Sequence, residues 1–343
     1  MIIVDFHRPR TTAAKRILYM GAMLALPCAA ALGEEQGLFT TSDQSPFIQL
    51  YSLPSAAARP APGRGRWGWQ LTVDVASNAI EEGTPAAAHV VLSGETYRTA
   101  VYLDYGLTER LTAGLMLPLV VHSDGVLDGL IRDWHDLFGL SNERRDAVSD
   151  RALDYSYTSQ GSDSFALEER SRGPGDLRLA LDWHVRPTPG EGRSLVLRSG
   201  LKLPTGTSRE LHGSGSTDLS LQLLSIDSQT LARWNMTLSW MAGGLWLGRA
   251  DVLDGIRRDW VAIGSIGVSR PLWRRFVARI QLDGHSAFYD TGLRPLGSSS
   301  VQVTFGGSFA VGRTGRIDVA MVENLYTDTT PDLGLHLGWR GAL

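Results

Sequence analysis

The sequence predicts a transmembrane antiparallel up-and-down β-barrel of about twelve strands. Three observations support this fold class: apolar and polar residues alternate with a period of two, several alternating segments reach ten residues or more, and short and long connections alternate. Strands of soluble proteins usually have about five or six residues, whereas a tilted strand needs about 9 to 11 residues to cross a bilayer. A soluble β-sandwich explains the alternation but not these lengths.

Composition excludes two other classes. The 343 residues include 33 basic and 36 acidic residues, and the net charge of −3 disfavours a nucleic-acid partner bound through a basic face. A mean hydropathy of −0.08 is too polar for a bundle of membrane helices. The 38 glycines and 10 tryptophans are typical of turns and membrane interfaces. We therefore expect β structure in contact with lipid.

The first residues indicate export. Lys15 and Arg16 precede an apolar stretch over 17–31 that ends in small residues, which predicts a cleaved secretory signal peptide over residues 1–31. An uncleaved anchor helix is the alternative. Cys28 is the single cysteine and lies in this stretch, so we expect the exported chain to have no disulfide.

Residues 32–66 are expected to form an irregular periplasmic lead-in or a plug. Pro, Gly, Ala and Arg occur over 55–66 at a density that disfavours both helices and central strands. The barrel itself is then expected to cover residues 67–343.

The period of two is clearest over residues 176–186. Leu177, Leu179 and Leu181 alternate there with charged residues, a separation that a strand produces and a helix does not. The predicted strands cover residues 67–76, 90–104, 109–121, 174–186, 193–204, 216–226, 231–247, 259–270, 273–287, 299–311, 314–324 and 332–342.

The connections between these strands alternate in length. Short gaps such as 105–108 and 271–272 alternate with longer ones such as 205–215 and 288–298. Barrels of the outer membrane have short periplasmic turns and longer outer loops. We therefore expect the barrel to lie in the bacterial outer membrane, in contact with its lipid and with both termini in the periplasm. Tryptophans near strand ends, such as Trp183, are typical of an interfacial belt.

Residues 122–173 form an excursion far longer than a usual loop, and such insertions are often functional. Apolar residues recur at helical spacing over 126–138, which predicts a short amphipathic helix, and 151–170 has the pattern of a polar hairpin. We expect this extracellular excursion to fold over or into the mouth as a lid. The candidate lid residues are His122, Asp124, Asp128, Asp133, Trp134 and His135.

Four short motifs stand out in the chain. They are DQSPF at 43–47, GETYR at 94–98, YGLTER at 105–110 and the run HSDGVLDGLIRDWHDLFGL at 122–140. Together they resemble the DUF3187 family, uncharacterised bacterial proteins predicted to be outer-membrane β-barrels. The resemblance implies an outer-membrane location and a barrel fold, and it assigns no reaction and no catalytic residue.

An outer-membrane hydrolase acting on lipid or envelope substrates is one alternative, with His122, Ser123 and Asp124 as its residues. A serine nucleophile needs its base within hydrogen-bond reach, and neighbours on a strand point to opposite faces. The chain also lacks a Gly-x-Ser-x-Gly elbow. A metal site using His122, Asp124, Asp128 and His135 matches no known ligand spacing. We expect no catalytic residues, no metal and no cofactor.

The polar face of the strands is expected to line the lumen. Nine bases and five acids, Asp218 among them, fall on this face, which favours a channel or binding barrel for small polar or anionic solutes. The alternative is a structural envelope protein whose lumen is plugged by paired charges. The candidate lining residues are Asp176, Arg178, Asp182, His184, Arg186, Arg198, Lys202, Arg233, Arg275, Arg279, Asp283, Arg316, Asp318, His336 and Arg340.

Overall fold

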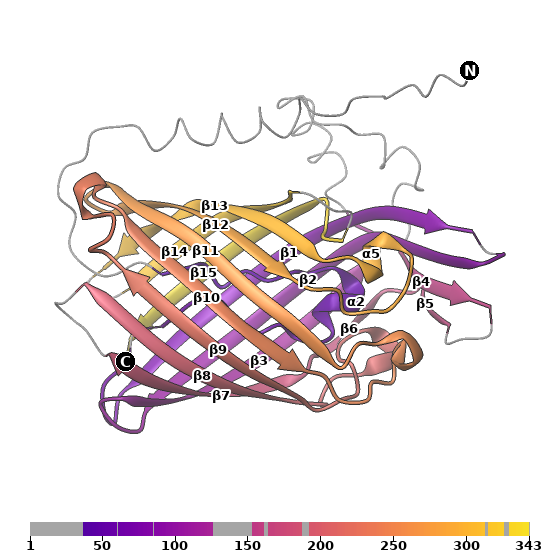
Figure 1. Cartoon of the computed structure of the whole chain (residues 1–343), viewed down its shortest axis with the longest axis horizontal. Helices are drawn as coiled ribbons and strands as arrows, with labels where there is room; N and C mark the ends of the chain where they lie inside the picture. Colours follow the sequence, from indigo (N-terminus) through magenta and orange to yellow (C-terminus); the bar gives the residue numbers. More distant parts are fainter. Residues whose placement is uncertain are drawn as a thin grey trace, which may run out of the picture.

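The strands form a closed antiparallel barrel. The computed structural model describes residues 37–59, 61–84, 86–125, 153–160, 164–186, 192–312, 315–325 and 329–342. Within these residues, twelve strands follow one another around the ring, and the first pairs back onto the last. Figure 1 shows the strands tilted around a long axis. The predicted fold class is confirmed.

The ring consists of twelve strands that correspond one to one with the predicted segments. They are β1 (Trp67–Gly83), β2 (Ala88–Gly106), β3 (Leu111–Ser123), β7 (Leu177–Arg186), β8 (Arg193–Leu203), β9 (Asp218–Asp227), β10 (Thr237–Trp246), β11 (Trp260–Trp273), β12 (Phe276–His285), β13 (Ser300–Val311), β14 (Gly315–Asn324) and β15 (Leu333–Ala342). The predicted signal peptide and the predicted helix over 126–138 lie outside the described residues.

Two boundaries differ from the prediction by more than three residues. The connection expected over 77–89 is short, because residues 77–83 of β1 continue to pair with residues 89–95 of β2. Residues 231–236, expected to begin a strand, form a turn that contains η2 (Ala232–Trp234). Asn235 ends this turn with a φ of 54°, a left-handed conformation that a strand does not contain.

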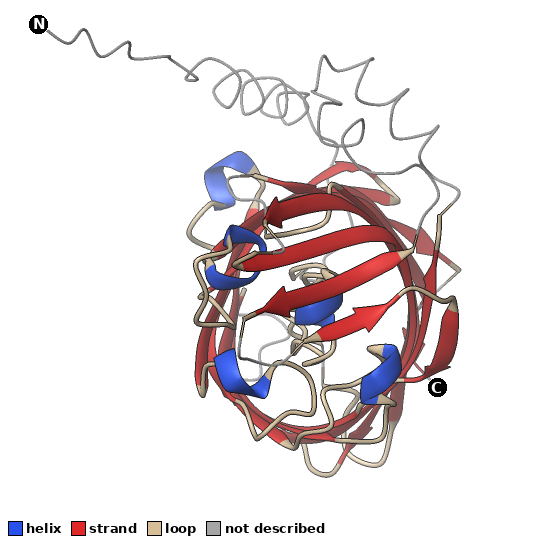
Figure 2. Ribbon diagram, turned by 90° about the vertical axis from the view of Figure 1, so that its right-hand side faces the viewer, coloured by secondary structure: helices blue, strands red, loops and turns tan. Residues whose placement is uncertain are grey.

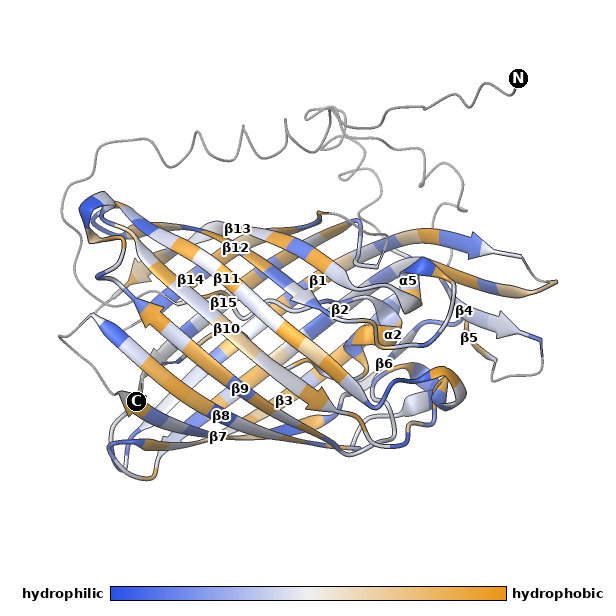
Figure 3. Ribbon diagram, viewed as in Figure 1, coloured by the Kyte–Doolittle hydropathy of each residue, from blue (hydrophilic) through white to orange (hydrophobic). Residues whose placement is uncertain are grey.

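The apolar face of the strands points outward. Leu179, Leu181 and Leu221 are 41%, 43% and 56% exposed, whereas Arg178 and Asp182, which flank the first two along β7, are buried. Figure 3 shows apolar residues along the outer wall. In a bilayer such a wall meets hydrocarbon, and closure of the ring leaves no unpaired strand edge in lipid.

The two ends of the barrel differ. The turn end carries the β2–β3, β7–β8, β9–β10, β11–β12 and β13–β14 connections, together with the start of β1 and the end of β15. The loop end carries the opposite connections, including η1 (Ser208–Glu210), η3 (Asp254–Ile256) and α5 (Arg294–Gly297). At this end β1 and β2 extend beyond the ring.

A small sheet continues the barrel wall at the loop end. β4 (Asp154–Ser159) pairs with the extension of β2, and β5 (Phe165–Leu167) pairs with β4. β6 (Ser171–Pro174) pairs with the last residues of β3. The excursion therefore contains a hairpin within the range predicted from the sequence, and it returns to the ring at β7.

Residues 37–59, here called the plug segment, lie inside the ring. They include the short helix α2 (Pro46–Gln49), all of whose residues are buried. Figure 2, viewed along the barrel, shows a helix within the ring of strands. Among the described residues, no helix has the length and apolar character needed to span a membrane.

Candidate functional site: the lumen and its plug segment

The first arm of the plug segment runs from the half of the lumen nearest the turn end, here called the lower lumen, towards the loop end. The Arg279 guanidinium donates to the Gly37 carbonyl at 3.2 Å, and the Phe39 amide donates to Gln281 Oε1 at 2.6 Å. Farther up, Asp43 Oδ2 lies 3.0 Å from His285 Nε2. Because Arg279, Gln281 and His285 follow one another along β12, this arm runs alongside that strand.

The tip of the plug segment is apolar and fully buried at the loop end. Tyr51 stacks on Phe288 with ring centroids 5.2 Å apart, and the Tyr289 hydroxyl donates to the Phe47 carbonyl at 2.8 Å. Gln49 Nε2 donates to the Leu211 carbonyl at 2.6 Å. Burial raises the pKa of the Tyr289 phenol well above its ordinary value, because the charged form would lose its hydration. The loops and the plug tip thus form one apolar core.

The second arm returns to the turn end along β7 and β8. Arg178 donates to the carbonyls of Tyr51 and Ser52, and Arg198 donates to the carbonyls of Ser55 and Ala57, the latter two at 3.1 and 3.2 Å.

Near the turn end, Arg59 of the plug segment forms an ion pair of 2.7 Å with Asp104. A backbone bridge joins Arg64 to Gly106 just before β1 begins. Both arms therefore reach down towards the same end of the barrel, and the plug segment is a hairpin with its tip at the loop end.

Two of the arginines that hold the plug segment are themselves neutralised by wall carboxylates. Arg198 makes two bonds to Asp182, at 2.7 and 2.6 Å, and Arg279 pairs with Asp318. Guanidinium groups present several donors in a plane, so one arginine serves a carboxylate and a carbonyl together. Each guanidinium therefore links the barrel wall to the plug backbone.

A second buried charge cluster lies near the loop end. Lys202 Nζ is completely buried and lies 2.8 Å from both Asp176 Oδ2 and Asp218 Oδ2. The ammonium also lies 5.7 Å from the Tyr51 ring. Buried charges are tolerated only when paired and hydrogen-bonded, as they are here.

Twelve of the fifteen candidate lining residues lie on the inward side of the ring. Asp176, Arg178, Asp182, His184, Arg198, Lys202, Arg279, Asp318 and His336 are buried, and Asp283, Arg316 and Arg340 share their face with partial exposure. The side chain of Arg186 lies outside the described part of the chain.

Arg233 and Arg275 lie elsewhere than predicted. Both are exposed in turn-end connections, Arg233 within η2 and Arg275 in the two-residue turn between β11 and β12. Counting every second residue assigns both arginines to the inward face. Both lie outside the strands, however, so the alternation no longer decides where their side chains point.

Sequence reasoning also missed lumen residues on β1 and β2. Arg98, Asp74 and Asp104 are buried on the inward face. The same alternation could have found them. Among described side chains, the lumen then holds seven bases and seven acids, and the expected excess of positive charge disappears. The bases are Arg98, Arg178, Arg198, Lys202, Arg279, Arg316 and Arg340, and the acids are Asp74, Asp104, Asp176, Asp182, Asp218, Asp283 and Asp318.

A small cavity remains between the two arms of the plug segment and the wall. Its volume is about 30 Å³, and Asp43, Leu53, Met241, Asp283 and His285 are among the residues that line it. A cavity of this volume has room for about two water molecules. The cavity is thus too small for an organic solute while the plug segment is in place.

The residues proposed for a hydrolase are not assembled into a relay. His122 faces the lumen, where Nδ1 lies 3.0 Å from Thr96 Oγ1 and the ring stacks on His212. Ser123 instead donates to Asp124, which Arg170 also binds. The bond from Arg170 lowers the pKa of the Asp124 carboxyl. The remaining lid candidates, Asp128, Asp133, Trp134 and His135, lie outside the described residues.

A different serine and histidine meet at the loop end. Ser171 Oγ lies 3.1 Å from His212 Nε2, and Glu210 Oε2 lies 3.3 Å from His212 Nδ1. The serine hydroxyl also bonds to the Glu210 carbonyl, at 3.4 Å, and the His212 side chain is fully buried. These contacts fix the β8–β9 loop against β6. Among the described residues, no group of three or more side chains has the geometry to hold a metal ion.

Comparison with known proteins agrees with the fold. A family model described as "Protein of unknown function (DUF3187)" matches residues 15–341. No curated protein matches the chain.

Solved structures are similar in architecture. The COG4313 outer membrane channel from Pseudomonas putida F1 aligns with a TM-score of 0.53 at 13% identity, over 83% of this chain and 97% of that one. The Ralstonia pickettii toluene transporter TbuX aligns with a TM-score of 0.40 at 11% identity, over 91% and 96% of the two chains. The first of these likenesses shows a shared barrel fold.

Proposed function

The chain belongs to the DUF3187 family of proteins of unknown function, and from this premise we propose that it is an outer-membrane channel for small polar solutes that the plug segment holds closed. The observation that carries the proposal is the hairpin course of residues 37–59. Because both arms run towards the turn end, the segment can withdraw as one piece without breaking any strand pairing of the ring.

The apolar outer wall supports the outer-membrane location, together with the predicted signal peptide over residues 1–31. The short connections of the turn end are those that such barrels place in the periplasm. In this orientation the plug segment withdraws towards the periplasm. A lid formed by the excursion over 122–173 remains a prediction.

The lumen charges support polar solutes of either sign. The described lumen side chains are balanced, seven bases to seven acids, so withdrawal of the plug segment leaves no large field of one sign. The similar barrel from Pseudomonas putida is an outer membrane channel, and this likeness supports passage rather than catalysis.

Conductance in planar bilayers tests the proposal. We expect the full chain to be largely closed, and a chain lacking residues 37–59 to conduct at least tenfold more, with weak selectivity between anions and cations. The heat-dependent mobility of the barrel on gels verifies folding of both proteins. A folded but non-conducting deletion protein would contradict the channel function and favour a structural envelope protein.

A reversible lock provides a second test that leaves the chain complete. The hydroxyl oxygens of Thr41 and Thr304 lie 3.3 Å apart, one on the plug segment and one on β13. A disulfide between T41C and T304C, with C28S to remove the native thiol, joins segment to wall. We expect oxidation to abolish openings and a reductant to restore them, whereas either single cysteine variant does not respond. Unchanged openings after verified oxidation would exclude the plug segment as the gate.

A further inference from the structure

Charge is distributed unequally between the two ends of the barrel. At the turn end, the exposed bases Arg64, Arg66, Arg110, Arg233, Arg274 and Arg275 surround the opening. The exposed acid described at this end is Glu109, and the half-buried Asp227 is already paired with Arg193 at 3.0 Å. This arginine set, here called the turn-end arginines, gives this rim a strong positive charge.

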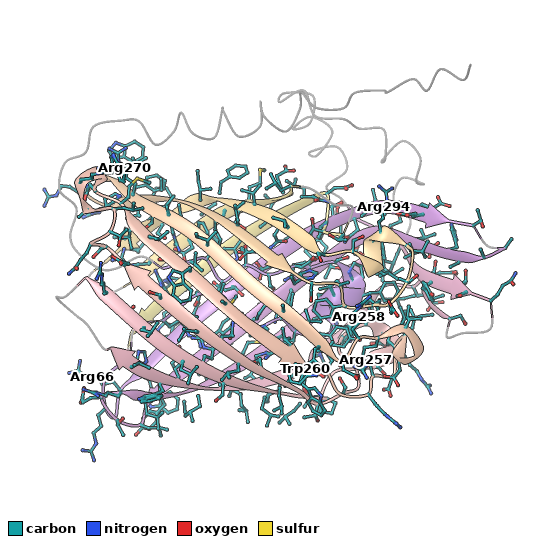
Figure 4. All side chains as sticks on the ribbon, in the orientation of Figure 1. Arg66, Arg257, Arg258, Trp260, Arg270 and Arg294 are labelled. Carbon is teal, nitrogen blue, oxygen red and sulfur yellow. The ribbon has the colours of Figure 1, made fainter. Side chains whose placement is uncertain are left out.

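Several arginines at the loop end have carboxylate partners, although Arg172, Arg209 and Arg249 are exposed there with no ion pair among the described residues. Arg257 pairs with Asp254, Arg258 with Asp290, and Arg294 with Glu82. Within the described part of the chain, none of the six turn-end arginines has such an ion pair. Figure 4 shows Arg66 and Arg270 at one end and Arg257, Arg258 and Arg294 at the other. The guanidinium groups of the turn end therefore remain available for an anion from outside the chain.

Tryptophans lie beside these arginines on the outer surface. Trp67, Trp183, Trp273 and Trp339 are 47 to 60% exposed at the turn end, and the Arg233 guanidinium lies 3.6 Å from the centre of the Trp234 ring. Tryptophan prefers the boundary between hydrocarbon and headgroups. The belt therefore places the turn-end arginines at the depth of the lipid headgroups.

We propose that the turn-end arginines bind the phosphate headgroups of anionic phospholipid in the periplasmic leaflet. The planar guanidinium matches phosphate oxygens with two parallel donors, and a basic segment beside a membrane gains attraction from each arginine near an anionic surface. The adjacent tryptophan belt favours a lipid over a soluble polyanion, because it brings acyl chains and headgroups to the same place. This inference rests on the orientation given by the proposed function.

Native mass spectrometry of the full-length barrel in detergent tests this site. The probes are phosphatidylglycerol and phosphatidylethanolamine, which share a phosphate and differ in net charge. We expect the protein to retain phosphatidylglycerol preferentially and R233Q/R274Q/R275Q to bind it at least tenfold more weakly. The matched control R172Q/R209Q/R249Q removes three exposed arginines from the loop end and should bind as the unmodified chain does.

Three outcomes would overturn the proposal. They are equal binding of the two lipids, equal loss in both triple variants, and full displacement of the lipid by inorganic phosphate at equal concentration, which would indicate a phosphate site without lipid recognition. Gel mobility before and after heating verifies that each variant is folded. Lipid retention does not depend on conductance. The lipid-binding proposal can therefore be supported or contradicted even if the barrel proves not to be a channel.

Discussion

The plug segment is held by different interactions at the loop end and in the lower lumen. At the loop end, Phe47 and Tyr51 contact an apolar core, and removal of their surface from water is the main stabilising effect. In the lower lumen, arginines on the wall donate to backbone carbonyls of the segment. Apolar burial is not directional, whereas hydrogen bonds to carbonyls specify position along the chain. The apolar core at the loop end therefore provides most of the binding free energy of the plug segment. The hydrogen bonds inside the lumen determine which residues of the segment face which residues of the wall.

The largest loss of stability is expected when the contact between Arg198 and the plug segment in the lower lumen is removed. Arg198→Ala removes the partner of buried Asp182 and the donor to Ser55 and Ala57. Loss of one partner of a buried ion pair costs about 3–5 kcal/mol, because the other charge stays buried. Urea unfolding in lipid vesicles, followed by tryptophan fluorescence, measures the change. R198M/D182N should recover much of the loss, and a change below about 1 kcal/mol for R198A would show that the lumen pair is not structurally important.

An effect of similar size is expected from truncation of the plug tip at the loop end. Phe47→Ala empties a fully buried site, and such truncations cost about 3 kcal/mol or more. We expect the plug tip to detach more often, so proteolysis within residues 37–59 becomes faster while the barrel stays folded. Val101→Ala, on the outward face, is the control and should leave proteolysis unchanged. Equal protection in F47A and the unmodified chain would mean that the lumen contacts alone hold the segment.

A single hydrogen bond separates polar from apolar contributions at the mouth. Tyr289→Phe removes the hydroxyl that donates to the Phe47 carbonyl but keeps the ring that contacts Tyr51. The expected loss of plug-tip binding is about 1 kcal/mol, read from the same proteolysis assay. If Y289F weakens the tip as strongly as F47A does, the mouth depends on polar contacts and the contrast between the two regions fails.

The smallest effect is expected from pH at the loop end. Burial lowers the pKa of His212 below its ordinary value, with Glu210 acting in the opposite direction. The unfolded loop therefore takes up a proton at a higher pH than the folded one, so stability is present above the unfolded pKa and decreases as the pH falls below it. The hydrogen-exchange protection factors of residues 204–217, which are corrected for the intrinsic pH dependence of exchange, should decrease as the pH falls from about 7.5 to 5.5, on either side of the ordinary histidine pKa. In H212Q this difference should vanish, and a difference that persists there would assign it to another group.

The outward and inward faces of the strands could be predicted because they depend on local alternation. Leu179 and Leu181 face outward for the same reason that Asp182 faces inward, since successive side chains point to opposite faces. The rule fails where a strand ends, and Arg233 and Arg275 lie just beyond such ends. The alternation rule places Asp74 and Asp104 on the inward face only when it is also applied to β1 and β2. The predicted excess of positive charge in the lumen was wrong in part because these acids were not counted.

Neighbouring residues in the chain were enough to specify a membrane-sized barrel with an ionic interior, because period, strand length and connection length are all local properties. The folded ring was needed to show that residues 37–59 enter this interior and that Arg178, Arg198 and Arg279 bind them. Those arginines bind backbone carbonyls, and every residue has a carbonyl, so no pattern of side chains marks the acceptor. The tip and its core likewise come from loops far apart in the chain, which only closure of the ring brings together.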